Sequence, residues 1–245
     1  MDIAVELGFN KDRFLLSIGY FRNRSDDQLV NYPLPTITGF NSYQANLPAT
    51  VENSGWEFEA TTTNIQKRDF TWRSNFNITI PRNILRSFDG LENSSYYQTL
   101  VIGQPITRLY GYKFLNVDET NGNALYETVS GESSSTPVRS TDAFFTIANG
   151  IPEYYGGIGN SISYKNFQFD IFGQYAKQNI LGGLVHTAGN QFLNNYQYVA
   201  SRWQNAGDQT NMPRASTAFD RYYSNSSANI FDGSYFRIKN ISVSY

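Results

Sequence analysis

The chain has 245 residues, of which 16% are charged and 16% aromatic, and its formal net charge is −2. The charged share is well below the roughly 25% typical of soluble domains, whereas 18 Tyr and 18 Phe make an unusually large aromatic share. The small net charge and the lack of long Lys/Arg runs argue against nucleic acid as a partner, and the absence of cysteine excludes disulfides, a thiol nucleophile and cysteine-based metal sites.

Membrane-spanning helices are also excluded, because no apolar run approaches the 18 or so residues that a helix needs to cross a bilayer. The opening stretch, MDIAVELGFN, has neither a basic leader nor an apolar core of the kind found in secretion signals. If the protein is exported, we expect its export signal to lie outside this chain.

Alternating strands joined by short turns recur along the chain. The first two are separated only by NKDR, the next two by a turn around NIQKRD, and the third pair by KN. A last strand over 234–245 changes phase, so we expect a β-bulge near Lys239 or Asn240. The predicted hairpins pair residues 3–9 with 14–22, 56–60 with 70–80, and 154–164 with 167–176.

The clearest alternation is FTWRSNFNITI, residues 70–80. Its apolar face carries Phe70, Trp72, Phe76, Ile78 and Ile80, and its polar face carries Thr71, Arg73, Asn75, Asn77 and Thr79. In a soluble β-sandwich the apolar face would meet a second sheet, whereas in an outer-membrane barrel it would meet lipid and the polar face would line the interior. Periodicity alone does not choose between these two structures.

Short turns alternate with long connections over about 25–48, 82–152 and 178–232. All tight turns would then lie at one end of the sheet, as in barrels with short periplasmic turns and long extracellular loops. Eleven residues tilted by about 45° also span roughly 25 Å of apolar thickness. We therefore predict an all-β fold: an incomplete portion of an antiparallel transmembrane β-barrel, with about seven to eight long strands.

Several stretches resemble the C-terminal part of the SusC/RagA family of TonB-linked outer-membrane transporters. They occur in the family's order and include VENSGWEFEA (51–60), LYGYKF (109–114), YYGGIGNSISYKN (154–166) and SYFRIKNISVSY (234–245). The family resemblance implies that residues 1–245 are the C-terminal part of a TonB-dependent receptor barrel. The plug domain, the signal peptide and the remaining strands would be absent from this chain.

The resemblance also implies a function, namely uptake of glycans, oligosaccharides or peptides across the outer membrane of a Gram-negative, Bacteroidetes-type bacterium. The implied partners are outer-membrane lipid, a SusD-like surface lipoprotein, and TonB through the absent N-terminal regions. The alternative is a secreted all-β glycan-binding module, in which Trp72, Phe76 and Ile78 would be buried against another sheet.

Candidate site residues fall into two groups. Polar residues expected to face the barrel lumen are Arg73, Asn75, Asn77, Gln168 and Asp170. Aromatic residues of the long connections could stack on sugars or contact a partner, and Tyr96, Tyr97 and Trp203 are the best candidates. The alternative for each aromatic residue is that it packs the loops together. The other loop aromatics of this kind are Tyr110, Tyr112, Tyr196 and Tyr198.

No enzymatic chemistry is expected. The single histidine, His186, lies in a long connection without a cysteine to complete a zinc site or a nucleophile positioned beside it. DETNGN (118–123) lacks the spacing of a calcium loop, and Asn121-Gly122 is better explained as a hairpin turn that needs a positive φ. We therefore predict no catalytic residue, no metal site and no cofactor.

Overall fold

The computed structural model describes residues 1–33, 37, 39, 42–97, 99–142, 145–182, 189, 197–217 and 221–245. The described chain is mainly antiparallel strands and divides into two compact units. Unit 1 comprises residues 1–107, 151–178 and 233–245, and unit 2 comprises residues 108–150 and 179–232.

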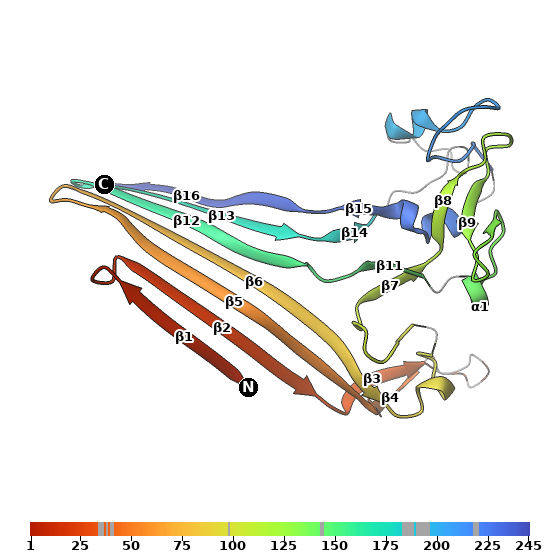
Figure 1. The fold of residues 1–245 in the computed structure, drawn as a ribbon, viewed down its shortest axis with the longest axis horizontal. Helices are drawn as coiled ribbons and strands as arrows, with labels where there is room; N and C mark the ends of the chain where they lie inside the picture. Colours follow the sequence, from red (N-terminus) through yellow and green to blue (C-terminus); the bar gives the residue numbers. More distant parts are fainter. Residues whose placement is uncertain are drawn as a thin grey trace. The chain divides into compact units, whose positions relative to one another are not determined.

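Unit 1 is built on one seven-stranded antiparallel sheet, whose strands lie side by side in Figure 1. The strand order is β1-β2-β5-β6-β12-β13-β16, so each long strand pairs with the next long strand along the chain. This confirms the predicted number of long strands. Their bounds are β1 Asp2–Phe9, β2 Phe14–Ser25, β5 Ala49–Gln66, β6 Phe70–Phe88, β12 Tyr154–Tyr164, β13 Phe167–Lys177 and β16 Tyr235–Ser244.

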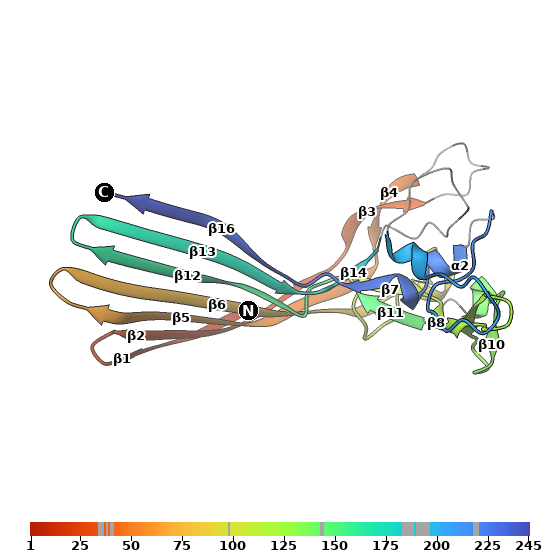
Figure 2. The same cartoon turned by 90° about the horizontal axis from the view of Figure 1, so that it is seen from above.

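The three tight turns lie together at one end of the sheet (Figures 1 and 2). Positive φ angles at Asn10, Lys11 and Asp12 close the first turn, and Lys165 has φ 51° in the two-residue turn between β12 and β13. Residues in this left-handed region reverse the chain within a few positions. The predicted separation of short turns from long connections is therefore confirmed.

Two strands are much longer than the sequence pattern predicted. The clean alternation ends at Ile80, but β6 continues to Phe88 and pairs with β5 back to Ala49. A small apolar core at this end stabilises the continued pairing, because Val51 and Leu85 are buried together and Tyr96 packs against them. The predicted connection over 82–152 therefore began too early, and that over 25–48 contains a hairpin of β3 Gln28–Pro33 and β4 Ser42–Leu47.

The phase change in the last strand is a β-bulge. Phe172 pairs with Asn240 and Gly173 with Ile238, so Lys239 is left without a partner across the β13–β16 ladder. The extra residue restores the apolar side chains on both sides of it to one face of the sheet. The bulge predicted near Lys239 or Asn240 is confirmed.

Unit 2 is formed by two of the long connections folding into one body. The backbone amide of Tyr112 donates to Asn225 O at 3.0 Å, and the amide of Phe114 donates to Ser227 Oγ at 3.0 Å. The elements are β7 Arg108–Gly111, β8 Lys113–Val117, β9 Ala124–Glu127, β10 Ser133–Ser134, α1 Arg139–Asp142, β11 Phe145–Asn149, β14 Asn179–Leu181, the 3₁₀ segments η3 Gln197–Ser201 and η4 Ser227–Asn229, α2 Arg221–Ser224 and β15 Ile230–Asp232. A further 3₁₀ turn, η2 Leu91–Asn93, belongs to unit 1.

The core of unit 2 is aromatic. Tyr126 is fully buried, and its ring centre lies 5.8 Å from that of Tyr112. Tyr112 directly precedes β8 and forms an isolated β-bridge with Ser226. Tyr222 and Tyr223 of α2 add edge-on contacts to Tyr112 and to Phe114. Residues from both connections therefore share one core.

No helix in the described part of the chain is long and apolar enough to cross a membrane.

Candidate functional site

The register of the seven-stranded sheet gives it one continuous apolar face. Phe76 of β6 lies between Ala60 of β5 and Ile158 of β12, and the same face continues to the strands at both edges. Its large side chains are exposed: Trp56 by 49% and Phe76 by 39%. The other exposed members of this face include Ile3, Val5, Leu7, Phe9, Phe14, Trp72, Ile80, Phe167, Phe236, Ile238, Ile241 and Val243.

This exposure decides between the two structures left open by the sequence. The β-sandwich alternative requires Trp72, Phe76 and Ile78 to be buried, yet Trp72 and Phe76 are exposed and Ile78 is only half-buried. An exposed apolar face of this extent is far larger than the scattered apolar residues of a soluble surface. The burial expected for a sandwich is therefore wrong for this chain.

The opposite face brings together all five residues predicted to face a lumen. Arg73 lies across from Ser161 of β12, which in turn lies across from Asp170 of β13. The neighbouring rows of this polar face hold Asn75 opposite Gly159, Asn77 opposite Gly157, and Ser163 opposite Gln168.

A shallow hollow lies on this polar face at Gly159. It encloses about 320 Å³ and is lined by Arg73, Asn75, Ser161, Asp170 and Phe172, among others. The hollow depends on glycine, because a Cβ there would lie 2.0 Å from Asn75 Oδ1. Three of the five predicted polar residues thus surround one depression.

Hydrogen bonds hold the polar side chains along β13 in place. Gln168 Nε2 donates to both carboxylate oxygens of Asp170, at 3.1 and 2.9 Å, and Ser242 Oγ of β16 approaches Asp170 Oδ2 at 3.5 Å. Asn77 Oδ1 accepts a 2.8 Å bond from the amide of Gly157. The polar face therefore presents ordered donors and acceptors rather than a random polar surface.

The sequence prediction missed the acidic part of the polar face. Glu59 of β5 lies opposite Asn77 on one side and Ser17 on the other, and Ser17 lies opposite Glu6 of β1. Glu57 shares this face two residues away. The signal was present in the sequence, because Glu57 and Glu59 alternate with Trp56 and Phe58.

The two adjacent tyrosines of the long connection have different surroundings. Tyr96 packs against the core at the far end of β5 and β6, with its ring 6.1 Å from that of Phe88. Tyr97 is 58% exposed. Of this pair, only Tyr97 offers an open ring face, and its contact with a ligand or partner stays a prediction.

Trp203 packs within unit 2. Its indole Nε1 donates to Glu119 O at 3.0 Å, and its ring covers Gly122, where a Cβ would lie 2.4 Å from the indole. Gly122 has φ +72°, which confirms the predicted positive φ in the turn between β8 and β9. These contacts agree with the loop-packing alternative, and ligand contact at Trp203 stays a prediction.

The remaining loop aromatics divide in the same way. Tyr112 is buried in the unit 2 core, Tyr198 is exposed, and Arg108 stacks on the ring of Tyr110 at 4.3 Å. Burial raises the pKa of the Tyr110 hydroxyl. Tyr196 and His186 lie outside the described residues, among which no cluster of three or more His, Cys, Asp or Glu could hold a metal ion.

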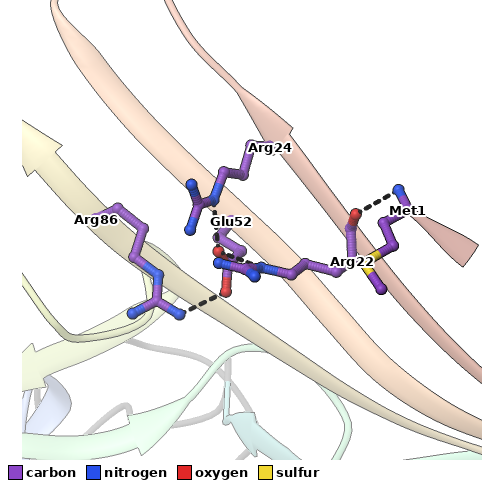
Figure 3. A network of polar contacts seen from close by, with 5 residues as sticks. All are labelled: Met1, Arg22, Arg24, Glu52 and Arg86. Carbon is purple, nitrogen blue, oxygen red and sulfur yellow. Dashed lines mark hydrogen bonds and ion pairs between the residues drawn. The ribbon is translucent and has the colours of Figure 1, made fainter.

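A second polar cluster, which the sequence analysis did not identify, lies beyond the apolar belt, the band of large apolar side chains on the apolar face that ends at Tyr20, Trp56 and Ile80. In Figure 3, the carboxylate of Glu52 on β5 accepts hydrogen bonds from three arginines. Arg22 Nε and Arg24 Nε of β2 donate at 2.8 and 2.7 Å, and Arg86 Nη2 of β6 donates the third. Glu52 is only 3% exposed. Hydrogen bonds from Arg86 and then Arg24 lower the pKa of Glu52 to about 2, so the carboxylate is ionised throughout the physiological range.

Comparison with known proteins finds TonB-dependent receptors to which the chain is similar. No family model matches the chain. It is 26% identical to TonB-dependent receptor P26 of Formosa agariphila over its whole length, and 26% identical to TonB-dependent receptor SusC of Bacteroides thetaiotaomicron over 68% of its length. The aligned regions make up 27% and 18% of these two proteins, so the chain spans about a quarter or less of their length.

The fold matches a solved transporter. A chain in a structure of the RagAB peptide transporter superposes on 99% of this chain with a TM-score of 0.80 and 19% sequence identity, and the match covers 28% of that chain. These relatives are named as receptors or a transporter, not as enzymes. The predicted fold class, a portion of an antiparallel transmembrane barrel, and the predicted resemblance to SusC/RagA are confirmed.

Proposed function

We propose that this chain, a portion of a SusC/RagA-type TonB-dependent receptor, forms part of the wall of an outer-membrane nutrient importer. The observation that carries the proposal is the two-faced single sheet, with Trp56 and Phe76 exposed on one face and Arg73, Asn75 and Asp170 gathered on the other. Such a sheet is stable only where its apolar face meets a nonpolar solvent.

The function of the wall is physical rather than chemical. The apolar face anchors the strands in lipid, and the polar face lines the interior of the barrel. There, amide, hydroxyl and carboxylate groups such as Asn75, Ser161 and Asp170 exchange hydrogen bonds with a hydrated substrate or with the plug. Energy for import comes from TonB through parts of the receptor that lie outside these 245 residues.

The substrate is a glycan, an oligosaccharide or a peptide, captured together with a SusD-like surface lipoprotein. Support comes from the relatives, which include SusC and a protein of the RagAB peptide transporter. Unit 2 is built from the long connections, which leave the strands at the end opposite the tight turns. This end is extracellular in outer-membrane barrels, so unit 2 contributes to the surface that meets substrate and lipoprotein.

An uptake assay tests the proposal. Asn75→Trp adds bulk to the polar face beside the Gly159 hollow, whereas the neighbouring Phe76→Trp keeps an aromatic ring on the apolar face. In the full-length receptor, we expect Asn75→Trp to slow growth of the host on the polysaccharide or protein digest that the receptor imports. Phe76→Trp should leave growth at the wild-type rate.

Outer-membrane amounts of both variants are measured by immunoblotting, so that a folding defect is not scored as a transport defect. Comparing polysaccharides with a protein digest as the only carbon source also identifies the substrate class. Equal growth of the two variants, with equal amounts in the membrane, would contradict a role of this face in transport.

A further inference from the structure

The arginine cluster around Glu52 lies on the same face of the sheet as the apolar belt. Arg22 and Arg24 are in phase with Tyr20 along β2, and Glu52 is in phase with Trp56 along β5. Arg82 of β6 is in phase with Ile80 and lies opposite Ser54, which itself lies opposite Arg22. Four arginines and one carboxylate therefore lie on the same, proposed lipid-facing side of the sheet, next to the end of the belt that is farther from the tight turns.

The height of the cluster matches the lipid headgroups. Arg22 and Arg82 are two residues beyond Tyr20 and Ile80, and Arg24 is four residues beyond Tyr20. At about 3.3 Å per residue and a tilt of about 45°, these steps place the Cα atoms of Arg22, Arg24 and Arg82 about 5–9 Å above the aromatic edge of the belt. The Cα of Arg86, six residues beyond Ile80, lies about 14 Å above this edge, but its guanidinium contacts Glu52, which is only four residues beyond Trp56. The headgroup zone of a bilayer is about 5–8 Å thick on each side.

The cluster keeps an excess of positive charge. Glu52 neutralises one of the four arginines, and the described residues provide no further carboxylate in an ion pair with Arg22, Arg24, Arg82 or Arg86. Asp26 and Asp27 follow the end of β2 without such a pair. Three positive charges therefore remain, and the side chains of Arg22, Arg24 and Arg86 are 37%, 53% and 45% exposed.

Several guanidinium donors of the cluster make no hydrogen bond to a described residue. Arg22 and Arg24 both reach the carboxylate through Nε, and their Nη groups make no hydrogen bond to a described residue. Arg82 likewise makes no hydrogen bond or ion pair to a described residue, although it is exposed. Glu52 therefore orients the arginines while leaving forked guanidinium donors open, a geometry that suits the oxygens of a phosphate group.

From this geometry we propose that Arg22, Arg24, Arg82 and Arg86 form a binding site for a phosphate-bearing lipid of the outer leaflet. The phosphate accepts hydrogen bonds from the open guanidinium groups, while the acyl chains lie against Tyr20, Trp56 and Ile80 of the belt below. Glu52 is a positioning residue that holds Arg22, Arg24 and Arg86 around one carboxylate. The inference rests on the proposed membrane orientation of the sheet.

Lipid retention by the full-length receptor tests this site. The purified receptor is titrated in detergent with monophosphoryl lipid A and with the same lipid after removal of its phosphate, and bound lipid is counted by native mass spectrometry. We expect retention of the phosphorylated lipid only. Arg82→Gln should weaken retention about fivefold, and Arg24→Gln combined with Arg82→Gln about 25-fold, because each surface arginine contributes a similar factor toward anionic lipid.

Arg73→Gln is the matched control, since it removes the same charge from the polar face of β6 and should leave lipid retention unchanged. Inorganic phosphate is added as a competitor at the same concentration as the lipid. Displacement of the lipid by inorganic phosphate would show a free-phosphate site and overturn the proposal. Equal retention by wild type, Arg82→Gln and the double variant would also overturn it.

Failure of the lipid site can be separated from failure of the importer. A cysteine at position 56 reports on the belt alone, by its reaction with a water-soluble thiol reagent in membranes. If wild-type receptor retains no lipid while Trp56→Cys is protected, only the lipid site is refuted. If Trp56→Cys reacts as fast as Asn75→Cys, the lipid-facing wall itself is refuted, and with it the basis of the lipid site.

Discussion

The two units of this chain are stabilised in opposite ways. Unit 1 is built on a single sheet whose large apolar side chains on one face are exposed or half-buried, and a small buried core lies at the far end of β5 and β6. Unit 2 has short strands and turns, but it buries Tyr112, Tyr126 and Tyr223 in an aromatic core of its own. The proposed membrane orientation accounts for this difference, because lipid would cover the apolar face of unit 1, whereas unit 2 would lie in water and need a core of its own.

The largest loss of stability in unit 2 is expected from removing a buried side chain of its aromatic core. Tyr126 is fully buried, so Tyr126→Ala should destabilise unit 2 by about 3–5 kcal/mol through lost burial and the cavity left behind. The exposed Tyr198→Ala is the control and should cost little. Limited proteolysis of the receptor in membranes measures both, and faster cleavage within 108–150 is expected for Tyr126→Ala alone. Equal cleavage of the two variants would refute a cooperative aromatic core.

The corresponding change in unit 1 is to place a charge on the apolar face. Phe76→Arg should destabilise the folded receptor in lipid vesicles by about 2–4 kcal/mol, the cost of a basic side chain near the bilayer midplane. Asn75→Arg, one residue away on the polar face, should cost far less. Denaturant unfolding followed by tryptophan fluorescence compares the two. Similar losses at 75 and 76 would mean that the faces do not meet different solvents.

A smaller effect is expected at the β8–β9 turn. Gly122→Ala and Gly131→Ala both force a non-glycine residue into a positive φ, of +72° and +83°, at a cost of about 1–2 kcal/mol. At Gly131 the added Cβ meets open space, whereas at Gly122 it meets the Trp203 ring. Gly122→Ala should therefore lose more stability in thermal unfolding. Equal losses would show that the Trp203 contact does not constrain the turn.

An effect confined to acidic pH is expected at the Glu52 cluster. The folded-state pKa of Glu52 is about 2 and its ordinary value is 4.5, so the ionised form is favoured in the folded state. This stabilisation is complete above about pH 4.5 and is lost as the pH falls toward 2. Glu52→Gln should remove that part of the acid sensitivity in unfolding measurements between these pH values, while Glu57→Gln should not. Identical acid profiles for wild type and Glu52→Gln would refute the prediction.

The strand pattern of the sheet was largely readable from sequence. Residues 154–164 and 167–176 alternate cleanly because one face of the sheet is apolar and the other polar, and the same alternation brought Arg73, Asn75 and Asp170 to one face. The phase change at Lys239 was visible because it breaks that alternation. Period-2 patterns of this strength fix both register and face.

The rest was hidden because its signals are not local. Pro81 and the irregular residues after it masked the extension of β6 to Phe88, which depends on burial of Val51 with Leu85. The aromatic core of unit 2 joins Tyr126 to Tyr222, far apart in the sequence. Similarly, nothing near Glu52 in the sequence indicates that Arg22, Arg24 and Arg86 converge on it.

The central claim is that the two faces of one sheet meet lipid and water. Single cysteines at Trp72, Asn75, Phe76 and Asn77 test it directly in the full-length receptor in membranes, after any other cysteine of that receptor is replaced by serine. A water-soluble thiol reagent should label positions 75 and 77 and spare 72 and 76, and a lipid-soluble reagent should show the reverse. Protection of positions 72 and 76 from both reagents would place them in a protein core and contradict the importer wall.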